Sequence, residues 1–416
     1  MPRKKKETVE QPVINIGMVG HVDHGKTTLL ERLSGKWADT HSEEIRRGIT
    51  IRLGYADVIF RKCPKCRGYQ SYNIKEECEK HKVKTKVLRK VSFVDAPGHE
   101  SLMATMLSGA TIMDGALLLI AANEPCPQPQ TREHLMALEI MGVENIVVVQ
   151  NKIDLVDDKQ ALENYKQIKM FLKTTKYKDS VIIPISAQQN VNINALIEAI
   201  EKNIPTVKRD TSKAPIMVIA RSFDINRPGT LIKDLKGGVL GGCLKQGKLT
   251  EGQEIEIRPG RMVEERNQKI WKPITTKITS IITGGAKVKE VIPGGSLGLQ
   301  TILDPAVVKS DSLAGTVIGL PGKLPKVWYE FKLEVHLLER VVGSKEDLNV
   351  EPIKLNEDLM LNVNSAATIG IVSKLGKSAI ECKLKLPICA NTGSRVTISR
   401  RIGNRYRLIG YGIIGE

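Results

Sequence analysis

No segment of the chain is apolar over the length that a membrane-spanning helix needs. The longest apolar run, residues 115–122, is far shorter than the roughly 18 to 20 residues required. The basic segment 2–6 is not followed by the apolar stretch of a secretory signal, and we expect residues 1–12 to form a disordered basic tail. The sequence therefore excludes a membrane-spanning protein and predicts one that is not secreted.

Cysteine is scarce and is not arranged as a disulfide framework. The chain has seven cysteines in 416 residues. Without a secretory signal they indicate a reducing compartment, which we take to be the cytoplasm. Cys126, Cys243, Cys382 and Cys389 stand alone in the sequence and are expected to be core or loop thiols. Disulfide bonds are not expected.

The composition is that of a folded, basic protein. Hydrophobic residues make up 41% and charged residues 26%, a balance that excludes a disordered chain, and the length suits two or three domains. The formal net charge of +17 suggests an anionic partner. Residues 61–90 alone hold eleven basic and three acidic side chains. This basic insertion is either a solvated charged face or a contact for nucleic acid.

The pattern of short apolar runs divides the chain into three parts. Runs typical of buried strands alternate with segments of helical period up to residue 205, at 13–19, 91–95, 116–122, 146–150 and 181–185. After residue 205 short alternating runs are broken by Gly and Pro, which indicates all-β structure. We therefore expect an α/β domain with a doubly wound, mostly parallel sheet at 13–208, followed by β-barrels at 209–325 and 326–416.

A glycine-rich loop with a lysine and a threonine follows the first of these strands. Residues 20–27 read GHVDHGKT, fit the pattern G-x4-G-K-[ST], and precede a segment of helical period. In such a loop the main chain wraps around phosphate groups and the helix N-terminus adds positive potential. We expect Lys26 to reach the β- and γ-phosphates and Thr27 to bind Mg²⁺. His21 and His24 are expected to shape the loop.

A second polar segment ends a later strand, at the sheet edge where doubly wound folds bind ligands. Residues 95–99 read DAPGH. Asp95 suits the surroundings of Mg²⁺, and Gly98 can donate its main-chain N–H to the γ-phosphate. His99 can orient an attacking water, or it can be a structural histidine.

Two further segments select the base. NKID stands at 151–154 and Ser186-Ala187 follows the next strand. A carboxylate at Asp154 accepts from guanine N1–H and the 2-amino group, whereas adenine offers neither donor there. The NKID segment alone is a weak signal, but the four motifs in this order, each at a strand end, together predict GTP binding.

These motifs resemble those of translational GTPases of the elongation factor Tu class, with RRGITI at 46–51 as a further match. Within that class the chain is similar to the gamma subunit of archaeal and eukaryotic initiation factor 2. The similarity rests on the cysteine-bearing insertion and on these segments: 53–57, 102–110, 123–130, 221–226, 236–239, 338–343 and 405–410. It covers almost the whole chain after residue 12.

The resemblance implies a P-loop GTPase domain followed by two barrels. It implies a carrier of methionylated initiator tRNA to the small ribosomal subunit, in a heterotrimer with alpha and beta subunits. GTP hydrolysis would switch the affinity for tRNA, with GTP or GDP and Mg²⁺ as cofactors. No arginine of these motifs can be assigned as a catalytic finger, so we expect slow unaided hydrolysis. The source would be archaeal or eukaryotic.

The resemblance also implies roles for individual residues. Thr50 would complete the Mg²⁺ shell with Thr27, Asp23 and Asp95, and His99 would position the attacking water, with Asp23 and Gly98 beside it. The nucleotide would be bound by Asp23, His24, Gly25, Lys26, Thr27, Thr28, Gly48, Thr50, Asp95, Gly98, Asn151, Lys152, Asp154, Ser186, Ala187 and Gln188.

The basic insertion carries four candidate zinc ligands. Cys63, Cys66, Cys78 and His81 form C-x2-C-x11-C-x2-H, a spacing like that of a zinc ribbon. So short a segment has too little core to hold its shape unaided. We expect a structural zinc knuckle at about 61–90, with a metal-free knuckle as the alternative, because many members of the family have a cysteine in place of His81.

Other functions remain open at this stage. An elongation-type carrier such as the selenocysteine-specific factor shares the domains, but the cysteine insertion and the end of the chain at Glu416 argue against it. A GTPase subunit of a metabolic enzyme would respond to a small substrate and not to tRNA, and a ribosome-assembly GTPase would ignore aminoacylation. Five arginines within 395–407 form either an RNA-facing strip or a solvated barrel face.

Overall fold

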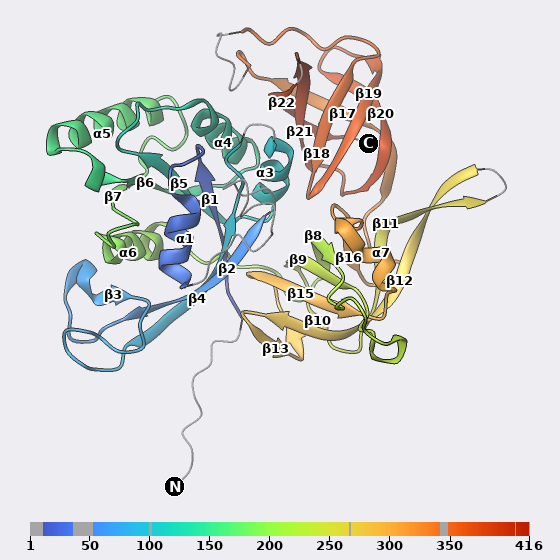
Figure 1. The fold of residues 1–416 in the computed structure, drawn as a ribbon. Coiled ribbons are helices and arrows are strands. Elements are labelled where there is room, and N and C mark those ends of the chain that lie inside the picture. The colour runs from blue at the N-terminus through green and yellow to red at the C-terminus, as the bar shows by residue number, and fades with distance from the viewer. Residues whose placement is uncertain are drawn as a thin grey trace.

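The structure is a computed structural model that describes residues 11–35, 53–99, 102–265, 268–341, 348–403 and 405–415. Figure 1 shows an α/β domain, here called the G domain, beside two β-domains, domain II and domain III. None of the helices in these described ranges combines the length and the apolar character needed to cross a membrane.

A seven-stranded sheet forms the centre of the G domain, in the order β3-β2-β4-β1-β5-β6-β7. Strands β4, β1, β5, β6 and β7 pair in this order, each parallel to the next. Strand β2 is antiparallel to β4, and β3 is antiparallel to β2. The strands are β1 (Asn15–Gly20), β2 (Gly54–Lys62), β3 (Tyr72–Asn73), β4 (Lys86–Asp95), β5 (Gly115–Ala121), β6 (Asn145–Asn151) and β7 (Ile182–Pro184). The helices are α1 (Lys26–Ser34), α3 (Met103–Ala110), α4 (Pro129–Ile140), α5 (Asp158–Leu172) and α6 (Ile193–Asn203), with 3-10 turns η1 (Gly68–Ser71) and η3 (Ile153–Leu155).

Both faces of this sheet are covered by helices. Leu118 and Ile120 of β5 pack in one apolar cluster with α3, α4 and α5, whereas Leu117 and Leu119 pack in another with α1 and α6. A strand that buries both alternating sets of side chains reads as a continuous apolar run. The expected doubly wound α/β sheet is confirmed.

Domains II and III are β-barrels, as expected. In domain II, six strands close a ring through the pairing of β11 with β12, and in domain III six strands form a closed barrel. Domain II consists of β8 (Ile216–Phe223), η4 (Ile232–Asp234), β9 (Val239–Gln246), β10 (Leu249–Thr250), β11 (Glu254–Glu265), β12 (Gln268–Thr283), β13 (Ala286–Val288), β14 (Glu290–Val291), β15 (Ser296–Thr301), α7 (Pro305–Val308), η5 (Lys309–Asp311) and β16 (Val317–Gly319). Domain III consists of β17 (Val327–Leu337), β18 (Asp358–Val363), β19 (Ala366–Leu375), β20 (Ala379–Cys389), β21 (Arg395–Ile402) and β22 (Arg405–Ile414).

The sequence patterns did not predict strand β2. It pairs with nearly the whole of β4, from Gly54 opposite Asp95 to Lys62 opposite Lys86. Strand β4 is also longer than the predicted run 91–95, because its first half lies in the charged insertion, where apolar residues are few. The insertion is therefore an extension of the main sheet, continued by β3.

Domain II contacts the first strand of the G domain. The Asn15 side chain, at the start of β1, accepts from the Ser296 hydroxyl at 3.1 Å and donates to the Cys243 sulfur at 3.3 Å. The main-chain oxygen of Pro12 accepts from the Gly295 N–H at 2.9 Å, so this end of the expected tail lies against domain II.

Domain III contacts helix α4. Arg407 of β22 forms a 2.5 Å ion pair with Glu133 of α4, and the two side chains are 13% and 3% exposed. Arg395 donates to the Ile140 carbonyl at the end of the same helix, at 2.7 Å. Arg400 pairs with Glu357 at 2.5 Å within domain III. Arg400 and Arg407 are therefore held by structural ion pairs, whereas Arg395, Arg401 and Arg405 are exposed. For these exposed arginines the two alternatives, an RNA-facing strip and a solvated barrel face, stay open.

We predict that Arg407→Met will destabilise the protein by about 3 to 5 kcal/mol at neutral pH, because it leaves the Glu133 carboxylate buried without its cation. Burial already raises the pKa of Glu133, with Arg407 opposing it. A folded-state pKa above the unfolded value favours folding at low pH, so the variant should recover stability as the pH falls. Urea unfolding at neutral and acidic pH measures this.

The matched control is the double variant Glu133→Gln, Arg407→Met, which buries a neutral amide in place of the carboxylate. It should lose less stability than Arg407→Met alone and show a weaker dependence on pH. Equal losses in the two variants would contradict the assigned role of this ion pair.

Candidate functional site

The predicted nucleotide motifs meet at the carboxyl edge of the G-domain sheet. The loop 20–27 connects β1 to α1, Asp95 ends β4, Asn151 ends β6, and Ser186-Ala187 follows β7. Because parallel strands end at one edge, this topology brings four segments together that are far apart in the sequence.

Hydrogen bonds hold the glycine-rich loop to the other motifs. The Asn151 side chain donates to the His24 carbonyl at 2.9 Å and accepts from the Ala187 N–H at 3.0 Å. Gly25 has a φ of 87°, and a Cβ on it would lie 2.3 Å from Asn151 Nδ2. The second glycine of the motif is therefore required by both its conformation and its neighbour.

Thr27 and Asp95 are brought together as the Mg²⁺ prediction requires. The Thr27 hydroxyl donates to Asp95 Oδ2 at 2.9 Å, and Asp95 is fully buried. A hydroxyl and a carboxylate at one point are oxygen ligands of the kind that Mg²⁺ prefers in phosphate sites. These two residues therefore fit the ion. Asp23 lies in the same loop, exposed, with a φ of 60°.

Lys26 lies under the loop, with its ammonium group enclosed. Its Nζ donates to the carbonyls of Gly20 at 3.0 Å and His21 at 2.6 Å. Burial lowers the pKa of Lys26 to about 8, and Asp95 and Asp23 oppose this shift. A Cβ at Gly98 would lie 2.5 Å from this Nζ. Gly98 thus approaches the lysine at the place predicted for the phosphates.

The remaining predicted residues differ in how deeply they are buried. His24 is fully buried and bonds to the Leu119 carbonyl at 3.0 Å, so it shapes the loop as expected. His99 and Asp154 are exposed, and Ser186 is buried. The backbone of Lys152 adopts the left-handed conformation, with a φ of 64°. Thr28 is half-buried in the first turn of α1. Gly48 and Thr50 lie outside the described residues.

Two contributors were not found from the sequence. His134 of α4 accepts from the Gly20 N–H at 3.0 Å, and burial lowers its pKa to about 3, so it is a neutral acceptor. Arg32 of α1 donates to the carbonyls of Ala187 at 3.0 Å and Gln188 at 2.9 Å. Neither residue stands in a motif. The helical pattern of 129–140 does not distinguish His134 from an ordinary core residue.

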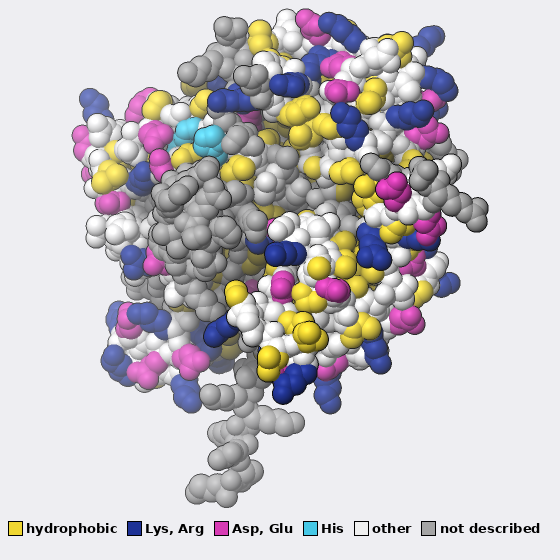
Figure 2. All heavy atoms as spheres, turned by 45° about the vertical axis from the view of Figure 1, so that its right-hand side comes forward, with side chains coloured by type: hydrophobic (Ala, Val, Ile, Leu, Met, Phe, Trp, Pro, Cys, Tyr) yellow, Lys and Arg dark blue, Asp and Glu magenta, His cyan; other side chains and the backbone are white. Residues whose placement is uncertain are grey.

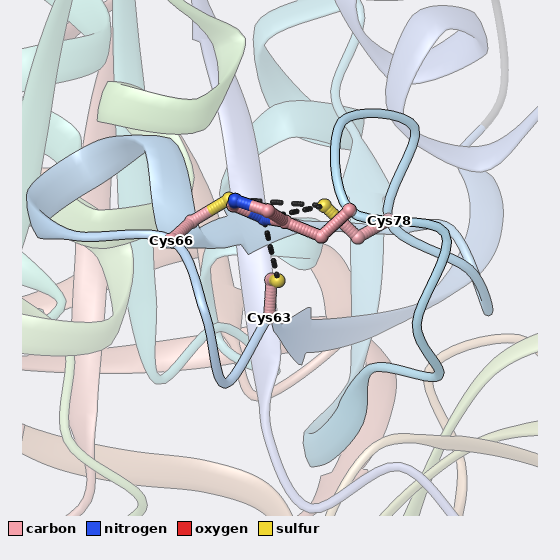
Figure 3. Close-up of side chains that lie close together, drawn as sticks. Cys63, Cys66 and Cys78 are labelled. Carbon is pink, nitrogen blue, oxygen red and sulfur yellow. Dashed lines mark hydrogen bonds between the residues drawn. The ribbon is translucent and has the colours of Figure 1, made fainter.

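The cysteine insertion brings its four candidate ligands to one point. The sulfur atoms of Cys63, Cys66 and Cys78 and Nδ1 of His81 all lie within 4.8 Å of one another. His81 Nδ1 is 3.8 Å from Cys63 Sγ and 3.3 Å from Cys66 Sγ, and Cys66 Sγ is 3.7 Å from Cys78 Sγ. Figure 3 shows the labelled cysteines converging.

The separations of 3.3 to 3.8 Å are close to those of a tetrahedral zinc site. Bonds of about 2.3 Å to sulfur and about 2.0 Å to nitrogen give edges of about 3.5 to 3.8 Å between ligand atoms. The main-chain N–H of His81 also lowers the pKa of the Cys78 thiol, and thiolates are the form that binds metal. The residues present therefore fit zinc.

Family models match both ends of the chain. The model "Elongation factor Tu GTP binding domain" matches residues 11–206, and "Initiation factor eIF2 gamma, C terminal" matches residues 329–414. The translation initiation factor 2 subunit gamma of Methanocaldococcus jannaschii is 58% identical over 410 residues, covering 99% of each chain. That of Pyrococcus furiosus is also 58% identical, over 99% of this chain and 100% of its own.

The chain belongs to the gamma-subunit family of translation initiation factor 2. It is a translational GTPase, as the sequence predicted, and GTP or GDP with Mg²⁺ fits its G domain.

Solved structures support the fold of this gamma-family chain. A bacterial selenocysteine-specific elongation factor has a TM-score of 0.72 at 22% identity, over 96% of this chain and 58% of its own. The elongation factor SelB of Methanococcus maripaludis, in complex with the GTP analogue GppNHp, has a TM-score of 0.71 at 23% identity, over 99% and 80%. At these identities the likeness shows the arrangement of a G domain and two barrels.

We predict that the affinity for GTP falls as the pH rises above about 8, approaching tenfold per pH unit. The protein alone loses the Lys26 proton with a pKa of about 8, whereas the bound triphosphate holds the charged form, so binding takes up a proton. Isothermal titration calorimetry in buffers of different ionisation enthalpy measures both quantities.

Lys26→Arg is the control, because a guanidinium group does not titrate in this range. Any pH dependence that remains in this variant belongs to guanine or to other groups. A wild-type profile no steeper than that of the variant, without proton uptake, would contradict the assignment to Lys26.

Proposed function

We propose that this chain, in the cytoplasm, carries methionylated initiator tRNA to the small ribosomal subunit when GTP is bound. It would do so as the core of a heterotrimer with alpha and beta subunits. The observation that carries the proposal is 58% identity to initiation factor 2 gamma subunits over 99% of the chain. The G domain, domain II and domain III follow one another in the same order as in those relatives, because the match extends over almost the full length of both chains.

The nucleotide-site roles are part of this proposal. Lys26 would bind the β- and γ-phosphates, while Thr27, Asp95, Asp23 and the undescribed Thr50 would hold Mg²⁺ directly or through water. The 2.9 Å contact between Thr27 and Asp95 supports this assignment.

The base and the reacting water would be handled by exposed groups. Asp154 would accept from guanine, and its exposure leaves its carboxylate accessible from outside the loop. Gly98 would donate its N–H to the γ-phosphate, and His99, exposed directly after it, would orient the attacking water. Ordering of these segments by γ-phosphate and Mg²⁺ would set the affinity for tRNA, and hydrolysis would reset it.

We also propose that Cys63, Cys66, Cys78 and His81 bind a structural zinc ion. Four protein ligands fill a tetrahedral site and leave no position for a reactive water. The ion would hold the ends of the insertion together, where apolar packing is sparse.

Zinc binding predicts different outcomes for two substitutions of one ligand. His81→Cys supplies a thiolate and should retain one zinc per chain, whereas His81→Ala should lose most of it and expose the insertion to protease. Metal content by mass spectrometry and limited proteolysis measure this. Zinc-free protein whose insertion resists protease equally in all forms would favour the metal-free knuckle.

The carrier proposal is tested by measuring the affinity for methionylated initiator tRNA and for elongator methionine tRNA. Each affinity is measured with a GTP analogue and with GDP, and in the presence and absence of an alpha subunit. We expect tight, initiator-selective binding that weakens with GDP. The ratio of the two affinities is the coupling free energy between the nucleotide and tRNA sites.

Each alternative predicts a different result in this experiment or in a parallel assay of GTP hydrolysis and of selenocysteyl-tRNA binding. Equal or absent binding under all conditions would overturn the carrier role and leave the GTPase intact. Stimulation of hydrolysis by a small substrate, without affinity for tRNA, would point to a metabolic subunit. Preference for selenocysteyl-tRNA would point to the elongation-type carrier.

A further inference from the structure

The insertion of the G domain, residues 61–90, carries more positive charges than its ion pairs neutralise. Four of its eleven basic side chains are bonded to a carboxylate or to a main-chain carbonyl of another described residue. Arg61 pairs with Glu76 at 3.4 Å, Lys75 pairs with Glu79, Arg89 pairs with Glu201 at 2.6 Å, and Lys90 donates to the Gly284 carbonyl at 2.5 Å. The first two pairs use two of the three acidic residues of the insertion.

The other seven basic side chains are exposed, and within the described part of the chain none has a carboxylate partner at ion-pair distance. They are Lys62, Lys65, Arg67, Lys80, Lys82, Lys84 and Lys86. Only Glu77 remains among the acidic residues of the insertion. Figure 2 shows Lys and Arg side chains on the lobe at the lower left, with Asp and Glu side chains among them.

The strand register sets two of these charges against each other. Lys62, the last residue of β2, lies directly opposite Lys86 of β4 and directly opposite Tyr72 of β3. Like charges in directly opposed positions destabilise an antiparallel pair, so this arrangement costs the sheet stability. Lys62 Nζ also lies 4.6 Å from the centre of the Tyr72 ring and 3.3 Å from its hydroxyl. A bound anion would turn this repulsion into attraction.

We propose that this face, called here the basic knuckle face and consisting of the seven exposed basic residues with Tyr69 and Tyr72, binds the phosphate backbone of RNA. RNA fits better than an acidic protein because aromatic rings accompany the cations. Tyr69 is 47% exposed, and exposed rings beside Lys and Arg provide stacking surfaces for bases.

The position of this face separates it from the nucleotide site and from domain III. Figure 1 shows β3 at the outer end of the G-domain sheet, away from domain III. The face can therefore bind RNA without using the motifs at the carboxyl edge of the sheet. The proposal goes beyond the tRNA-carrier function and does not require it.

The test compares two charge-reversed forms of the full chain. Lys62→Glu, Lys65→Glu, Arg67→Glu alters the basic knuckle face, and the control Lys323→Glu, Lys377→Glu, Lys383→Glu alters exposed lysines next to or within domain III. Both remove the same net charge. Fluorescence anisotropy with labelled single-stranded and duplex RNA of about 20 nucleotides measures binding across a range of salt concentrations.

We expect the knuckle variant to bind RNA at least about tenfold more weakly than the parent near 0.1 M salt, with a salt slope shallower by about 2 to 3, as the loss of three phosphate contacts predicts. The control should change affinity less than about twofold. Nucleotide affinity should match the parent in both forms. Thermal unfolding of the knuckle variant should occur at a temperature no lower than that of the parent, because Lys62→Glu removes the repulsion by Lys86. The neutral form Lys62→Gln, Lys65→Gln, Arg67→Gln should weaken binding in the same direction, and it replaces the reversed form if that form does not fold.

Three results would overturn the proposal. Equal weakening in both reversed forms would show that net charge alone is sensed. Unchanged binding in the knuckle variant would remove this face from RNA contact. Tighter binding of an acidic peptide such as polyglutamate, competing with RNA only at the knuckle face, would assign the face to an acidic protein.

Discussion

The phosphate-binding loop is held in shape by hydrogen bonds to its main chain, and the rest of the site depends on this constraint. Its first N–H, at Gly20, is bonded to the neutral His134, and the His24 carbonyl is bonded to Asn151. A buried main-chain group without a partner costs about 1 to 3 kcal/mol, so both contacts strongly favour one loop conformation. The loop leads directly into α1, and the N–H groups at a helix N-terminus favour the binding of phosphate.

Both barrels contact elements that lead into this loop or bond to it. Domain II contacts Asn15, where β1 begins, and β1 ends at Gly20. Domain III contacts Glu133, whose neighbour His134 bonds to Gly20. A change in the loop on nucleotide binding would act on β1 and α4, each of which contacts a different barrel. This arrangement provides a physical route for coupling, and its size is a free-energy difference between the nucleotide states.

The predictable parts of this molecule are those encoded by local spacing. The phosphate loop, the base-selecting segments and the convergence of the four zinc ligands each depend on residues a few positions apart, or on strand ends that the topology brings to one edge. The contacts of His134, Glu133 and Arg395 pair residues that are far apart in the sequence, and no local pattern indicates them. Arg400 and Arg407 show the same limit, since their partners Glu357 and Glu133 lie 43 and 274 positions away. Strand β2 was missed because its charged end lies in the insertion.

The central claim is that guanine nucleotide, held through Asp154, controls the affinity for tRNA. It is tested most directly by Asp154→Asn, which replaces an acceptor by an amide that can also donate to the 2-carbonyl of xanthine. The measurement is the affinity for methionylated initiator tRNA with non-hydrolysable analogues of GTP and of xanthosine triphosphate. We predict that tRNA binding by the variant responds to the xanthosine analogue and no longer to the GTP analogue. A variant that still responds to the GTP analogue, and ignores the xanthosine one, would contradict the claim.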